Sequence, residues 1–250
     1  MDNISSMIPY GKQDINQNDI DAVIEVLKSD FITQGPKIPA FEKSITDYTG
    51  AKYAFAVNSA TSALHIACLA LGVGKGDIVW TTPITFVASA NCALYCGAEV
   101  DFVDIDEKTY NMSVVALEEK LFTARKNNKL PKVIIPVHLT GQSCNMEAIH
   151  KLSKEYNFKI LEDASHAIGG KYKNEPIGNC KYSDITVFSF HPVKIITTAE
   201  GGITITNNTK LAEKISLFRN HGITRDQALM TEVPHGSCIT NKLNSVITTE

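Results

Sequence analysis

Apolar positions along the chain follow two spacings, one typical of helices and one typical of strands. Near the N-terminus they recur every three or four residues over 16–29 and again over 38–48, which predicts two helices, the second ended by Gly50. Short runs of β-branched and aromatic residues, which favour buried strands, then alternate with helical stretches. The predicted strands cover 53–57, 78–82, 100–105, 133–138, 158–161, 185–190 and 203–206, and the helices between and after them cover 63–71, 86–95, 113–127, 145–156 and 210–218.

This alternation predicts an α/β fold with about seven strands in a mostly parallel sheet between helices. In such sheets ligands bind beyond the carboxyl ends of the strands. Small or polar residues gather directly after four of the predicted strands, at 58–61, 85–86, 163–166 and 189–194. We therefore expect these four loops to converge on one edge of the sheet.

The loop with a single lysine, Lys194, lies between the strand at 185–190 and a Gly201-Gly202 pair. A lysine just past a buried strand can be desolvated, and desolvation lowers its pKa. More of the amine is then neutral and able to attack a carbonyl group. A solvated lysine in an ordinary loop is the alternative, and the loop alone does not exclude it.

The segment 58–62 turns from a strand into a helix through small hydroxyl residues. Amides at the start of a helix and nearby hydroxyls can together hold an anion such as phosphate. The alternative is plain capping of the helix by Ser59 or Thr61.

The four loops together offer what pyridoxal phosphate (PLP) requires. Ala60, Thr61 and Ser189 can bind a phosphate, and the ring of Phe86 offers a face for stacking. Asp163 can pair with a protonated ring nitrogen, and Lys194 can bond to the aldehyde.

Three motifs, at 58–64, 162–167 and 188–202, carry a resemblance to a known family. They resemble the DegT/DnrJ/EryC1/StrS family of PLP-dependent nucleotide-sugar aminotransferases, which have the aspartate-aminotransferase (type I) fold. Asp-Ala-Ser-His-Ala at 163–167 and Ser-Phe-His-Pro-Val-Lys at 189–194 are most similar to the branch that serves pseudaminic acid biosynthesis. The similarity runs from about Tyr10 to about Gly222.

The resemblance implies roles for individual residues. It makes Lys194 the catalytic lysine that forms a Schiff base with PLP, and Asp163 the partner of the ring nitrogen. It places His166, where many relatives have Gln, near the ring oxygen of the cofactor. The remaining implied contacts are Phe86 with the PLP ring, Ala60, Thr61 and Ser189 with the phosphate, and Tyr10, Asp30, Phe31, Ile32, Thr33, Ala60 and Ser189 with the sugar nucleotide.

The implied reaction moves an amino group from glutamate to the 4-keto group of a UDP-linked 4-keto-6-deoxy-N-acetylhexosamine, in a homodimer. The resemblance also implies an N-terminal arm at 1–35, a PLP-binding large domain at 36–225 and a divergent tail at 226–250 in place of a small C-terminal domain. Two alternatives stay open. One is an inactive, truncated relative that binds PLP or a nucleotide sugar without turnover, and the other is an aminotransferase for another dideoxy sugar nucleotide, of perosamine or legionaminic type.

Composition disfavours several other classes of function. The formal net charge of −3 and the lack of a basic patch disfavour nucleic acid as a partner. No apolar run is long enough to span a bilayer, and no secretory signal is evident, so we expect a cytoplasmic protein without a membrane partner. Cys92 and Cys96 have metal-compatible spacing but lack further ligands, so we expect reduced buried thiols and no metal site.

Overall fold

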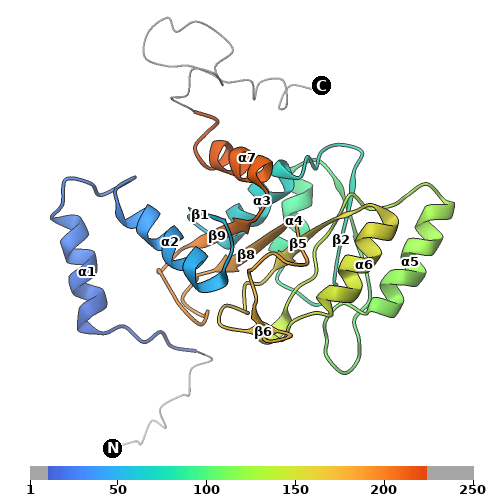
Figure 1. Cartoon of the computed structure of the whole chain (residues 1–250), viewed down its shortest axis with the longest axis horizontal. Helices are drawn as coiled ribbons and strands as arrows, with labels where there is room; N and C mark the ends of the chain where they lie inside the picture. Colours follow the sequence, from blue (N-terminus) through green and yellow to red (C-terminus); the bar gives the residue numbers. More distant parts are fainter. Residues whose placement is uncertain (1–10, 224–250) are drawn as a thin grey trace, which may run out of the picture.

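A seven-stranded sheet forms the centre of the molecule (Figure 1). The structure is a computed structural model, and it describes residues 11–223. The order of strands across the sheet is β1-β9-β8-β5-β4-β2-β3. Their bounds are β1 Tyr53–Val57, β2 Ile78–Thr81, β3 Glu99–Phe102, β4 Val133–Ile134, β5 Lys159–Asp163, β8 Ile185–Ser189 and β9 Gly202–Thr206.

All neighbouring strands of this sheet are parallel except where β9 pairs with β1 and with β8. The predicted α/β fold with a mostly parallel sheet is therefore confirmed. Since β9 alone runs the other way, the carboxyl ends of the other six strands share one edge with the amino end of β9. Gly202, the first residue of β9, pairs there with Ser189 of β8 and with Val57 of β1.

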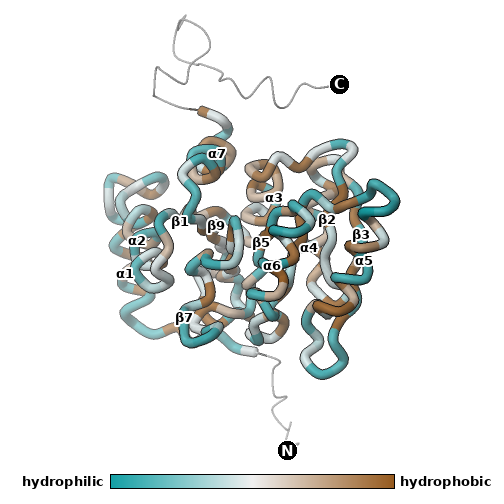
Figure 2. The backbone as a smooth tube through the Cα atoms, turned by 45° about the vertical axis from the view of Figure 1, so that its right-hand side comes forward, coloured by the Kyte–Doolittle hydropathy of each residue, from teal (hydrophilic) through white to brown (hydrophobic). Residues whose placement is uncertain are grey.

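Helices cover both faces of the sheet (Figure 1). Side chains of α3, α4 and α7 pack on one face, where Val133 and Val187 belong to the core, and α5 and α6 pack on the other face beside Ile134. Alternate strand residues thus enter opposite cores, as the pleat requires, and the hydrophobic stretches lie mostly toward the sheet (Figure 2). The helices are α1 Gln17–Leu27, α2 Lys37–Thr49, α3 Ala60–Ala70, α4 Ala88–Tyr95, α5 Val114–Lys126, α6 Met146–Tyr156 and α7 Thr209–Arg219, and the remaining elements are the turn η1 Leu139–Gly141 and the hairpin β6 Lys171–Tyr172 and β7 Glu175–Pro176.

Three predicted boundaries were wrong by three residues or more, one of them the end of β3, which is at Phe102 and not at 105. Helix α3 begins at Ala60, three residues before the predicted start, because the Ser59 side chain caps it. Strand β4 ends at Ile134, although the apolar run continues to 138. Pro136 has no N–H to donate to the ladder, and pairing resumes only as an isolated bridge between Val137 and Asp163.

Helix α1 lies at the end of the molecule beyond α2 (Figure 1), and none of its residues is buried. Its form is set locally, because Asn16 and Asp19 make a reciprocal capping box. The apolar side chains that predicted this helix are exposed to between 40% and 66%, and they are Ile20, Val23, Ile24 and Leu27. Within residues 11–223, no helix combines the length and the apolar character needed to cross a membrane.

Candidate active site

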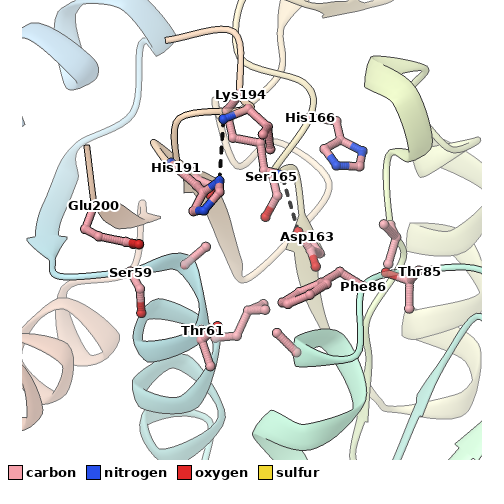
Figure 3. Close-up of a pocket in the computed structure, with 17 residues that line it drawn as sticks. Ser59, Thr61, Thr85, Phe86, Asp163, Ser165, His166, His191, Lys194 and Glu200 are labelled. Carbon is pink, nitrogen blue, oxygen red and sulfur yellow. Dashed lines mark hydrogen bonds between the residues drawn. The ribbon is translucent and has the colours of Figure 1, made fainter. Parts of the chain in front are cut away.

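One pocket at the carboxyl edge of the sheet collects residues from all four predicted loops (Figure 3). Its volume of about 370 Å³ falls within the range of small-ligand sites. Seven residues expected at the cofactor line it, and they are Ala60, Thr61, Phe86, Asp163, His166, Ser189 and Lys194. The lining also includes Ser59, which the sequence suggested as a helix cap, and four residues for which the sequence suggested no role: Thr85, Ser165, His191 and Glu200.

The start of α3 forms one wall of the pocket. The Ser59 Oγ accepts the Ser62 N–H at 3.1 Å, so the capping interpretation is correct. Capping leaves the N–H groups of Ala60 and Thr61 without acceptors inside the helix, because the first-turn amides have no preceding carbonyls. These amides lie at the positive end of the helix dipole, so the same turn can also hold an anion.

Gly202 allows β9 to approach this turn closely. A Cβ atom at residue 202 would lie 2.4 Å from the Ser59 carbonyl carbon and 2.5 Å from the Ala60 nitrogen. Both contacts are with backbone, which cannot move aside as a flexible side chain can. A glycine is therefore needed for the helix start to sit against the strand.

We expect Gly202→Ala to lower the free energy of unfolding by roughly 1–3 kcal/mol, because it overpacks this contact. It should also weaken phosphate binding at Ala60 and Thr61 by displacing their amides. Thermal unfolding and phosphate titration followed by backbone amide NMR would measure both effects. Gly74→Ala is the matched control, since a Cβ there meets nothing within 4 Å; equal losses in the two variants would contradict the expectation.

Asp163 ends β5 and is 4% exposed. Its Oδ2 accepts the Ser89 hydroxyl at 2.6 Å, and its Oδ1 accepts the Ser165 N–H at 3.1 Å. Ser89 in turn lies 2.9 Å from the Thr85 Oγ1. These bonds hold the carboxylate in one orientation, and each of its oxygens keeps a lone pair for a ligand in the pocket.

Lys194 lies on the loop between β8 and β9, across the pocket from the start of α4 (Figure 3). The loop is closed at its base, because Phe190 donates to the Gly201 carbonyl at 2.9 Å and accepts from the Thr198 N–H at 3.0 Å. Burial lowers the pKa of the Lys194 amine, and the carboxylate of Asp163 partly opposes this effect. The amine is therefore easier to deprotonate than that of a solvated lysine.

Phe86 precedes α4 and is 70% exposed at the rim of the pocket, so its ring has a free face. The buried hydroxyl residue Ser189 lies at the end of β8, facing the same cavity. Neither α1 nor the turn after it lines the pocket: residues 30–33 are exposed, with Ile32 at 71%. Their contact with a sugar nucleotide stays a prediction, and Tyr10 lies outside the described residues.

A buried acid–histidine pair, Glu162 and His138, lies next to the pocket, since the adjacent residues Asp163 and Val137 line it. The Nε2 of His138 is 2.8 Å from the Oε2 of Glu162, and the hydroxyl groups of Ser183 and Thr186 donate to the Oε1 of the same carboxylate. Burial alone would raise the pKa of Glu162, but these hydrogen bonds outweigh it and hold the pKa below its usual value. Glu162 is therefore ionised at neutral pH, one residue before Asp163.

We expect Glu162→Gln to be less stable than the wild type at pH 7, since its amide cannot replace a carboxylate that accepts three bonds. A depressed pKa in the folded state gives stability that is present above the unfolded pKa and is lost as the pH falls through the folded one. The difference in free energy of unfolding should therefore shrink below pH 4.5, the ordinary value for Glu. Urea unfolding from pH 3 to pH 8 would measure it, and a difference independent of pH would contradict the expectation.

The thiols of the described residues pack as hydrophobic groups. Cys92 and Cys96 direct their sulfurs to carbonyls of their own helix, at 3.4 Å from Ser89 and 3.3 Å from Cys92. No cluster of three or more His, Cys, Asp or Glu side chains suited to a metal occurs in residues 11–223. The sixth cysteine, Cys238, lies outside that range.

Comparison with known proteins gives matches over most of the chain. The model of the DegT/DnrJ/EryC1/StrS aminotransferase family matches residues 13–245. The UDP-4-amino-4,6-dideoxy-N-acetyl-beta-L-altrosamine transaminase of Campylobacter jejuni subsp. jejuni serotype O:23/36 (strain 81-176) is 46% identical over 219 residues, which make up 88% of this chain and 56% of that protein. The chain thus spans little more than half the length of this curated relative.

Solved structures share the fold. Helicobacter pylori PseC, an aminotransferase involved in the biosynthesis of pseudoaminic acid, has a TM-score of 0.80 and 36% identity over 93% of this chain and 60% of its own. A Streptococcus pneumoniae protein assigned as a sugar aminotransferase, in its PLP form, has a TM-score of 0.77 and 32% identity over 88% of this chain and 59% of its own.

Proposed function

Because the chain belongs to the DegT/DnrJ/EryC1/StrS aminotransferase family, we propose that it supplies the PLP-binding domain of a sugar aminotransferase. One observation supports this most directly: a half-buried lysine and a buried carboxylate face the same cavity as a helix N-terminus. The domain bounds expected from the sequence, 36–225 for this unit, stay a prediction.

The pocket has donors and acceptors of the kind that PLP needs. We assign the phosphate to the amides of Ala60 and Thr61 and the hydroxyl of Ser189, and the ring to the exposed face of Phe86. These amides lie on the turn at the start of α3, which occupies the space where a Cβ of residue 202 would lie. Gly202 therefore lets the phosphate-binding turn sit against β9. PLP, when bound, supplies an aldehyde and a ring that accepts electrons.

Lys194 is the catalytic residue of this proposal. Its amine would hold the aldehyde of PLP, and the same amine, when not bonded to the aldehyde, would carry a proton to and from the substrate carbon. Partial burial favours the neutral amine that both tasks require, because it lowers the pKa of the lysine. Ser89 and Ser165 hold the Asp163 carboxylate in one orientation, in which it could keep the ring nitrogen of PLP protonated.

We assign glutamate as the amino donor and a UDP-linked 4-keto-6-deoxy-N-acetylhexosamine as the acceptor. The acceptor is supported by the similarity to the altrosamine transaminase and to PseC, whose names describe amino sugars of this kind. Glutamate is carried over from the family resemblance of the sequence motifs. A homodimer fits the surface around the pocket, where large apolar side chains are 49% to 70% exposed: Phe86, Val87, Val193, Ile195 and Ile196. A cytoplasmic location stays a prediction.

Visible absorbance of the purified chain with PLP, before and after addition of glutamate, tests the proposal. We expect a visible band on loading and its conversion to the amine form by glutamate, but not by glycerol or acetate at the same concentration. Binding of PLP without conversion would favour the alternative of a relative that binds without turnover. No band at all would overturn the assignment of the pocket.

A further inference from the structure

The ring of His166 lines the pocket (Figure 3), and its Nδ1 is hydrogen-bonded to the protein backbone. The Nδ1 of His166 accepts the backbone N–H of Thr140 at 3.2 Å. A nitrogen that accepts a hydrogen bond carries no proton, so the ring is neutral and its proton is on Nε2. The backbone of Thr140 therefore decides which tautomer this histidine adopts.

The N–H of Thr140 points at His166 because the turn η1 has an unusual backbone. Thr140 has φ 54°, in the left-handed region that β-branched residues rarely adopt. Gly141 follows with φ 92°, and a Cβ there would lie 2.9 Å from the His166 carbonyl oxygen. The turn is thus pressed against the backbone of His166, where a side chain at 141 would not fit.

Buried groups on both sides hold this strained turn in place. Asn111, which is 3% exposed, accepts the Leu139 N–H at 3.0 Å and donates to the Gln142 carbonyl at 2.9 Å. The His138 N–H donates to the Asp163 carbonyl at 3.0 Å. A strained conformation persists only where surrounding contacts hold it in place. Here one of those contacts is made by Asp163, which lines the pocket.

The charges around His166 favour the same protonation state. Burial and the nearby Lys194 lower the pKa of His166, and Asp163 opposes them in part. The Nε2 hydrogen then remains as a donor for a ligand in the cavity, while the Nδ1 lone pair is already used.

We propose that the turn at 138–142 is a positioning element that locks His166 in its Nε2–H tautomer, so that the ring presents a hydrogen-bond donor to an anionic oxygen of the ligand. The identity of that ligand, PLP with its ring oxygen, rests on the proposed function. The tautomer does not, since it follows from contacts within residues 111–166. A glutamine at 166 would offer an amide N–H of similar reach, whereas alanine would offer no donor.

Two-bond ¹H–¹⁵N NMR spectra of the full chain, labelled with ¹⁵N-histidine, test the tautomer directly at pH 7. The variant His166→Gln identifies the signals of residue 166 by their loss. We expect a protonated Nε2 and an unprotonated, hydrogen-bonded Nδ1. A ring protonated at Nδ1 would overturn the proposal, whether it is neutral or an imidazolium.

A pair of glycine variants tests the part played by the turn. Gly141→Ala should push the turn from His166 and give a mixture of tautomers. Gly76→Ala is the matched control, because Gly76 has nearly the same φ, 89°, and a Cβ there meets nothing within 4 Å. The control should keep the wild-type spectrum, and an unchanged tautomer in folded Gly141→Ala would overturn the role of the turn.

PLP titrations of the same variants separate this inference from the proposed function. His166→Gln should bind PLP within about threefold of the wild type, and His166→Ala should bind about 10- to 100-fold more weakly, as expected for a lost hydrogen bond to a charged acceptor. Equal affinities of the alanine and glutamine variants would overturn the donor role. If the wild type binds no PLP, the proposed function fails, and the NMR result still decides the tautomer.

Discussion

Lys194→Ala is expected to abolish the visible band of the PLP-loaded protein and to reduce any glutamate-dependent conversion by at least about 10³-fold. The reason is that the variant loses both the amine that bonds to the aldehyde and the group that carries the proton, a role worth roughly 10²–10⁴ by itself. Absorbance spectra and single-turnover rates with glutamate would measure the two losses.

The matched control for this variant is Lys154→Ala. Lys154 is an exposed lysine on α6 that does not line the pocket. It should keep the band and the rate of the wild type. A Lys194→Ala variant with an unchanged spectrum, or equal losses in both variants, would contradict the assignment of Lys194.

Asp163→Asn is expected to leave the fold intact and to slow conversion by about 10²–10³-fold, in the range found when one preorganised electrostatic contact is removed. The amide keeps the size of the carboxylate. Its oxygen can still accept the Ser165 N–H, and its NH2 can donate to the Ser89 hydroxyl, which can turn to accept it, but the amide lacks the charge that holds a proton on the ring nitrogen. Circular dichroism would check the fold, and stopped-flow absorbance with glutamate would give the rate.

Asp104→Asn serves as the control for charge removal at the same edge of the sheet. Asp104 follows β3, is exposed and does not line the pocket. Its variant should react as the wild type does. Wild-type rates in Asp163→Asn would show that the buried carboxylate has no part in the chemistry.

The sequence predicted the sheet and the loops of the site for a physical reason. Periodicity marks where strands end, and in a parallel sheet those ends meet at one edge, so Lys194 and Asp163 are brought together although 31 positions separate them in the chain. The direction of β9 was not predicted, because its apolar run reads the same for either orientation. Boundaries failed where one residue overrides the pattern, as Ser59 does in α3 and Pro136 does in β4.

Contacts that hold the site residues from behind could not be predicted from the sequence. Ser89 reaches Asp163 across 74 positions, and Asn111 holds a turn 28 positions away. Polar residues such as these are common in helices and loops, and only the three-dimensional fold shows which of them are buried. The four-residue spacing of Thr85, just before α4, and Ser89, in its first turn, was a signal that could have indicated a polar contact there.

Borohydride reduction of the PLP-loaded chain, followed by peptide mass spectrometry, tests the central claim most directly. Reduction fixes the cofactor to whichever amine is bonded to it. The account predicts a single phosphopyridoxyl group, on the peptide that contains Lys194, and its loss when glutamate is added before the reductant. A modified lysine elsewhere, or an unmodified chain at saturating PLP, would contradict it.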